Sequence, residues 1–131
     1  MKAIVLLGRI LFSLIFLFSG FAHFMPATIA YSASQGVPMA SVLVPLSGVI
    51  AIIGALCIIL GFKAKFGAFM ILLFLIPVTF MMHRFWTVTD PMMRQMQMSM
   101  FMKNISMMGG ALIIAYFGSG PLSIDRKKSG Y

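Results

Sequence analysis

Four long apolar runs divide the chain, and they constrain its fold more than any other feature. The runs are Ala3–Phe24, Ser41–Phe62, Phe66–His83 and Met98–Phe117. Each is close to the ~20 residues that an α-helix needs to cross the hydrocarbon core of a bilayer. Only 9% of the 131 residues are charged, against 61% hydrophobic, whereas a soluble domain is about 25% charged. The sequence therefore predicts an all-α membrane protein, with one domain over residues 1–131 folded as a four-transmembrane-helix bundle.

The connectors carry residues that end or bend membrane helices. Pro26 ends the first run because proline lacks an N–H and disfavours helix before it. The following segment, Ala27–Gln35, is long enough for a short helix at the membrane interface. Pro77 predicts a kink or an opened hydrogen-bond ladder in the third run. Arg9 lies inside the first run, and no small-x-small cleavage site follows it. We therefore expect a retained membrane helix rather than a cleaved signal peptide.

Basic residues gather on one side of the predicted bundle. The chain carries 10 Lys+Arg against 2 Asp+Glu, a net charge of +8. Four spans place both termini on one side, with Arg9 snorkelling toward it and Arg84 and Arg94 on the other. The residues on the terminal side are Lys2, Lys63, Lys65, Arg126, Lys127 and Lys128. This bias predicts cytoplasmic termini for a multi-pass membrane protein. The charge is assigned to orientation and anionic lipid, with no nucleic acid as partner.

Two helical faces stand out within the runs. On the first run, residues spaced four, three, four and three apart share one face that we expect to point into the bundle. They are Arg9, Ser13, Phe16, Gly20 and His23. For Arg9 itself, a snorkelling anchor is favoured over an interior role. On the second run, small residues share a face that would let another helix approach closely. They are Ser47, Ala51, Gly54 and Gly61.

Polar residues are expected to converge near the outer end of the bundle. His23 closes the first run, His83 closes the third, Trp86 follows it, and Lys103 and Asn104 lie just inside the fourth. Their shared depth predicts a ligand pocket for a polar head group such as that of a quinone. The imidazoles would exchange hydrogen bonds near neutral pH. Lys103 would stabilise negative charge on a reduced ring oxygen, and Trp86 would cover an aromatic face.

The same residues have a structural interpretation. Histidine and tryptophan are half polar and suit the membrane interface. Lys103 would snorkel to that interface, and Asn104 would form a hydrogen bond with a neighbouring helix. The sequence leaves both interpretations open.

Methionine suggests a second and weaker chemistry. A dense series lies on or near the outer side: Met92, Met93, Met96, Met98, Met100 and Met102. Thioether ligands select Cu(I). Methionine is also a pliable apolar filler, and the chain has 14 of them. Copper handling is therefore the third of three functional hypotheses.

Short fragments occur in a characteristic order along nearly the whole chain. They are Gly8-Arg9, Ser19-Gly20-Phe-Ala-His23, Ala30-Tyr31, Gly36-Val-Pro38, Ile59-Leu-Gly61-Phe, His83-Arg-Phe-Trp86, Phe101-Met-Lys103-Asn104, Gly109-Gly110 and Gly120-Pro-Leu-Ser123-Ile-Asp125. Together they resemble the DoxX family of small bacterial inner-membrane proteins. The resemblance implies a four-helix bundle and a redox-associated or quinone-linked subunit. Many members of that family carry a glutamate where this chain has Ala51, so the resemblance implies no carboxylate-based proton handling here.

The leading hypothesis is thus a redox-associated inner-membrane subunit with a quinone or other lipophilic ligand at its outer end. The alternative is a non-catalytic membrane scaffold or partner-binding subunit. The expected environment is the lipid bilayer, and the expected partners are a redox-enzyme subunit or a second copy of the chain in a homo-oligomer. Enzymatic activity stays open.

Overall fold

The computed structural model describes residues 1–128 and consists of helices joined by short connections. In chain order they are α1 (Lys2–Ala22), α2 (Pro26–Ser34), α3 (Ala40–Leu60), α4 (Ala64–Met82), the 3₁₀ helix η1 (Phe85–Thr87), α5 (Pro91–Phe117) and α6 (Ile124–Lys128). Among the described residues, α1, α3, α4 and α5 are long and apolar enough to cross a membrane. The predicted all-α, four-span fold is confirmed. The single domain over 1–131 extends beyond the described residues and stays a prediction.

The helix bounds differ most from the predicted runs at α5. The fourth run was expected to begin at residue 98, but the helix begins at Pro91. Asp90 explains the early start, because its side chain accepts a hydrogen bond from the Met92 N–H at 2.9 Å and Pro91 suits the first helical position. Apolar content could not show this, since Arg94, Gln95 and Gln97 interrupt the apolar residues in the first turns of α5. The short helix expected in the first connector is present as α2, and α4 continues through Pro77.

Replacing Asp90 by alanine is expected to lower the free energy of unfolding by about 1 kcal/mol, because the Met92 N–H would lose its cap. Thermal unfolding in detergent, followed by circular dichroism, measures the change. Asp90→Asn keeps an acceptor oxygen and is the control, which should stay close to the wild type. An equal loss in both variants would contradict the capping role.

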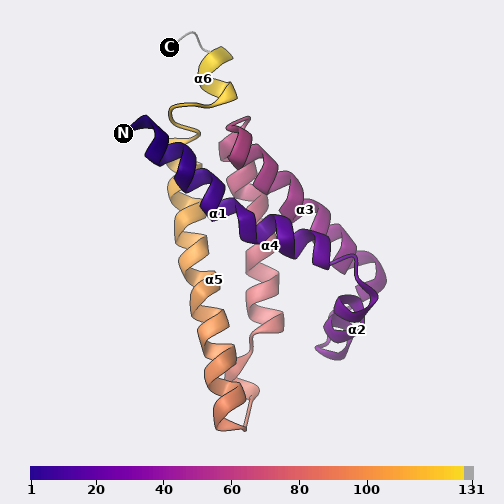
Figure 1. Ribbon diagram of the computed structural model, residues 1–131. Helices are drawn as coiled ribbons and strands as arrows, with labels where there is room; N and C mark the ends of the chain where they lie inside the picture. The colour runs from indigo at the N-terminus through magenta and orange to yellow at the C-terminus, as the bar shows by residue number, and fades with distance from the viewer. Residues whose placement is uncertain (129–131) are drawn as a thin grey trace.

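The long helices pack in series (Figure 1). α1 lies against α3, α3 against α4, and α4 against α5. The start of α1 and the short helix α6 lie at the same end of the molecule, which we call the terminal end. There α1 and α5 also meet, since a Cβ on Gly110 would lie 2.9 Å from the Phe12 ring. Toward the opposite end, the far end, the α1–α3 pair and the α4–α5 pair diverge, and α2 lies at the end of the first pair.

Glycines set the closest helix crossings. A Cβ on Gly48 of α3 would lie 2.5 Å from the Gly20 carbonyl oxygen of α1 and 2.9 Å from the His23 Cβ. A Cβ on Gly54 would lie 2.9 Å from the Gly67 carbonyl oxygen of α4. Such backbone approach supplies the van der Waals contact that holds membrane helices together. The crossing at Gly48 also fixes where His23 emerges from α1.

The interior combines an apolar core with several buried polar side chains. The core comprises Phe16, Ala51, Ala55, Ile58, Ala68, Ile71, Phe74, Leu75 and Ala111. Arg9 and Ser13 are buried on the same face of α1 as Phe16 and Gly20. Arg9 is only 4% exposed, and its guanidinium donates a hydrogen bond to the Leu122 carbonyl oxygen. The favoured interpretation of Arg9 as a snorkelling anchor therefore does not match its position, because the guanidinium is enclosed by protein.

Candidate functional site

A cavity of about 390 Å³ opens at the far end, between α2, α3, α4 and the end of α1. Its size falls within the ~300–1,000 Å³ of small-molecule sites. The wall is mostly apolar, with a few polar groups on the α1, α2 and α3 sides. It is lined by His23, Thr28, Ser32, Val37, Pro38, Leu43, Val44, Leu46, Ser47, Ile50, Leu73, Phe74, Pro77, Val78, Met81 and Met82. An apolar wall with a few polar groups is the usual composition of a lipophilic-ligand site.

His23 and Ser47 form the polar centre of this cavity. The Ser47 hydroxyl donates to the Val44 carbonyl oxygen at 2.6 Å, and its oxygen lies 3.4 Å from His23 Nδ1. A hydroxyl has one hydrogen, so Nδ1 must be the donor in this contact. In the neutral ring, Nε2 is then the acceptor. Thr28 and the buried Ser32 add hydroxyl groups from α2.

The surroundings of His23 favour an uncharged ring. His23 follows the last residue of α1, and its ring lies 5.3 Å from the Phe74 ring at an interplanar angle of 45°. Burial lowers the pKa of the His23 imidazole, because the charged form loses hydration there. In its neutral form the ring presents one donor and one acceptor nitrogen.

The second histidine, His83, lies outside the far-end cavity. His83 Nδ1 is 2.8 Å from the Gln97 Oε1 of α5, so it joins α4 to α5. Trp86 packs edge-to-face on Phe85 and on Phe101, with a ring-centroid distance of 5.9 Å to Phe101. These side chains form an aromatic contact between η1 and α5. Neither His83 nor Trp86 lines the far-end cavity.

Lys103 and Asn104 are also outside the cavity. Lys103 is exposed, and its amine donates to the Met100 sulfur at 3.4 Å. Asn104 is only 3% exposed. Of the five candidate residues, the structure therefore places only His23 at this cavity. The α1–α3 pair diverges from the α4–α5 pair toward the far end. Residues at the same depth along the membrane normal can therefore lie apart when they belong to different pairs.

Sequence reasoning did not assign Thr28, Ser32 and Ser47 to the site. Thr28 and Ser32 are four residues apart on α2, a spacing that puts both on one helical face. Ser47 belonged to the predicted small-residue face of α3. The available signal was thus a hydroxyl pair in a short interfacial helix, opposite a hydroxyl in an apolar span.

The methionine series lies along the first half of α5, where its side chains are exposed. Within residues 1–128, no group of three His, Cys, Asp or Glu could hold a metal ion. That finding does not address thioether ligands. Copper binding by Met92, Met93, Met96 and Met98 stays a prediction.

Comparison with known proteins identifies relatives over the full chain. The model of a family described as the SURF4 family matches residues 1–131. The inner membrane protein YphA of Escherichia coli (strain K12) is 31% identical over 126 residues, covering 95% of this chain and 89% of that protein. The inner membrane protein YqjF of the same organism is 31% identical over 124 residues, covering 93% and 89%. The Surfeit locus protein 4 homolog of Schizosaccharomyces pombe is 32% identical over 127 residues, covering 96% of this chain and 38% of that protein. No solved structure matches the chain.

These relatives correct the resemblance to the DoxX family, which is wrong: the full-length match is to a different family. The redox-associated, quinone-linked role was suggested by the polar residues at the outer end and by that resemblance, and it has no support from the relatives. A redox-enzyme subunit and a second copy as partners also lack support. What holds is a multi-pass membrane protein in a lipid bilayer. The chain belongs to the SURF4 family.

Proposed function

We propose that this protein binds a lipophilic molecule carrying a hydroxyl or another hydrogen-bond donor. The polar group would lie at His23 and the apolar part against the walls formed by α3 and α4. The observation that carries the proposal is the cavity of about 390 Å³ with an apolar wall and the His23 imidazole at one side.

The hydrogen-bonding pattern supports a donor on the ligand. His23 Nδ1 is engaged with Ser47, so Nε2 is the acceptor that a ligand hydroxyl would meet. A hydrogen bond in an apolar cavity selects strongly against molecules that cannot form it, because the polar group would be left unpaired. Specificity would therefore come from one hydrogen bond and affinity from apolar contact.

The cavity composition supports binding rather than chemistry. Among the residues that line it, His23 is the titratable one at neutral pH. The Ser47 hydroxyl beside it donates to the Val44 carbonyl oxygen at 2.6 Å, so the imidazole is not placed to take its proton as it would from an activated nucleophile. A carrier, buffer or sensor of a lipophilic compound needs only the single polar contact that the wall provides.

We also propose a bacterial inner membrane as the location, with the terminal end facing the cytoplasm. YphA and YqjF are named as inner membrane proteins. The terminal end carries Lys2, Lys63 and Lys65 together with the basic residues of α6, which agrees with the positive-inside rule. The cavity at the far end would then open toward the periplasmic leaflet.

A ligand pair tests the binding proposal. 1-Naphthol carries a hydroxyl donor, whereas 1-methoxynaphthalene has nearly the same shape and none. The wild type is expected to prefer 1-naphthol by about tenfold, the value of one net hydrogen bond. His23→Phe should abolish that preference because it keeps an aromatic ring and removes the acceptor. Fluorescence titration against empty nanodiscs measures both affinities.

His83→Phe is the matched control, since His83 contacts Gln97 and lies outside the cavity. It should retain the preference for 1-naphthol. The proposal fails if the wild type shows no saturable binding beyond empty nanodiscs, or if both histidine variants lose the preference equally.

A further inference from the structure

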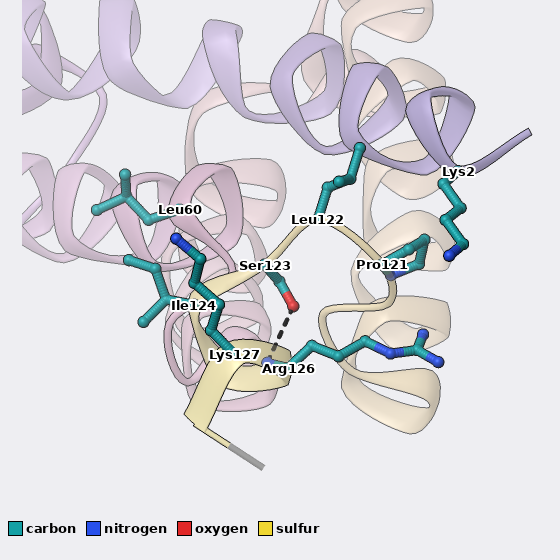
Figure 2. Close-up of a pocket in the computed structure, with 8 residues that line it drawn as sticks. All are labelled: Lys2, Leu60, Pro121, Leu122, Ser123, Ile124, Arg126 and Lys127. Carbon is teal, nitrogen blue, oxygen red and sulfur yellow. Dashed lines mark hydrogen bonds between the residues drawn. The ribbon is translucent and has the colours of Figure 1, made fainter. Parts of the chain in front are cut away.

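A second cavity, of about 530 Å³, lies at the terminal end (Figure 2). Its wall combines basic and apolar side chains from both ends of the chain and from α3. It is lined by Lys2, Leu60, Pro121, Leu122, Ser123, Ile124, Arg126 and Lys127. The far-end cavity and the function proposed for it involve none of these residues.

Hydrogen bonds attach the C-terminal segment firmly to the α3–α4 turn. The Asp125 carboxylate accepts hydrogen bonds from the backbone N–H groups of Lys63 at 2.9 Å and Ala64 at 3.4 Å. It also accepts one from the Ser119 hydroxyl at 2.6 Å. The Asp125 N–H donates in return to the Gly61 carbonyl oxygen at 2.8 Å. We call this set the C-terminal latch; it caps the start of α4 and places α6 against the turn.

Arg9 supports the loop that precedes α6. Its guanidinium donates to the Leu122 carbonyl oxygen, and the buried Nε and Nη1 have no hydrogen-bond partner among residues 1–128. A Cβ on Gly61 would collide with Arg9 Nη1 and with Ser123, so the glycine makes room for both. The cavity is therefore built on a fixed loop with a buried positive charge behind it.

The cations surround this loop from different elements. Figure 2 shows Lys2 of α1 and Arg126 of α6 extending toward the same side of the segment 121–124, while Lys127 extends toward Leu60 and Ile124. Two basic side chains thus lie beside the loop and a third lies beside an apolar edge. A site of this composition complements an anion that carries hydrocarbon.

We propose that this cavity binds the head group of an anionic phospholipid. The phosphate would lie near Lys2 and Arg126, with Lys127 at the apolar edge where the glycerol and acyl chains leave toward the bilayer. Basic pockets at the ends of membrane helices recognise such head groups, and each nearby Lys or Arg contributes about 1 kcal/mol. The latch would keep Arg126 and Lys127 of α6 beside the loop, which separates an ordered binding site from a diffuse positive surface.

Native mass spectrometry of the full chain in detergent tests the proposal, with phosphatidylglycerol and phosphatidylcholine as the two probes. Lys2→Ala and Lys127→Ala are each expected to weaken phosphatidylglycerol binding about fivefold and to leave phosphatidylcholine binding unchanged. Lys65→Ala is the matched control, because Lys65 is exposed beside the same turn but does not line the cavity. It should change binding by less than about twofold.

Asp125→Ala distinguishes an ordered lipid site from general electrostatic attraction of anionic lipid to a positive surface. It makes the chain more positive, so a diffuse surface would bind phosphatidylglycerol more tightly. Loss of the latch would instead release α6 and weaken binding. The proposal is overturned if Asp125→Ala strengthens binding, if Lys65→Ala matches Lys127→Ala, or if inorganic phosphate displaces the lipid and so identifies a soluble anion as the ligand.

Discussion

Replacing Gly48 by leucine is expected to lower the free energy of unfolding by about 3 kcal/mol. Even a Cβ at this position would lie 2.5 Å from the Gly20 carbonyl oxygen and 2.9 Å from the His23 Cβ. The Gly20 oxygen belongs to the backbone and the His23 Cβ is bonded directly to it. Neither atom can move aside unless α1 separates from α3. Unfolding in detergent, followed by circular dichroism, measures the change. 1-Naphthol binding should decline as well, because His23 is displaced.

Gly109→Leu is the control for this substitution. Gly109 lies within the membrane-spanning part of α5, and a Cβ there would meet nothing within 4 Å. Its replacement should change stability by less than about 0.5 kcal/mol. Equal destabilisation by both leucines would show that the loss comes from replacing a membrane-helix glycine in general, and not from the α1–α3 crossing.

Replacing Ser47 by tryptophan is expected to weaken 1-naphthol binding about 100-fold, which corresponds to about 2.8 kcal/mol. The indole would occupy part of the cavity of about 390 Å³, and the hydroxyl that orients His23 would be lost. Thr28→Trp reaches the same cavity from α2 and should have a similar effect. Titration in nanodiscs measures the affinity, and the melting temperature reports whether each variant is folded.

Ser41→Trp provides the comparison on the same helix, since Ser41 is exposed and does not line the cavity. It should bind 1-naphthol as the wild type does. Full binding by both Ser47→Trp and Thr28→Trp would place the ligand outside the far-end cavity.

The parts of the fold that the sequence predicted depend on single helices. Four apolar runs predict four spans because bilayer thickness sets helix length, and the spacing of Arg9, Ser13 and Phe16 defines a face that is buried. The start of α5 was misplaced because it depends on the Asp90 cap and not on hydrophobicity.

The sequence predicted less well how the helices are arranged around the bundle axis. His23 and His83 were expected to meet because both close a span at the same end. Depth along the membrane normal can be counted in residues, but the angular position of a helix depends on which partner it packs against. The crossing at Gly48 directs His23 toward α2 and α3, whereas Gln97 draws His83 toward α5.

The mistaken family resemblance has a similar physical origin. The fragments that suggested it are short and are rich in glycines, aromatic residues and basic residues, many of them at helix ends or in the connectors. Those residue types recur at such positions in membrane proteins generally, because interfaces favour aromatic and basic side chains and helix contacts favour small ones. Similarity over the full length carries more information than such ends alone.

The serial packing of the helices also has a consequence for biosynthesis. α1 packs against α3, α3 against α4 and α4 against α5. Each of these contacts can form soon after the later helix of the pair leaves the ribosome and enters the bilayer. The hydrogen bond from Arg9 to Leu122 spans 113 positions and can form only after residue 122 has left the ribosome. Until then, α1 carries an arginine into the bilayer without the carbonyl oxygen that will accept its hydrogen bond.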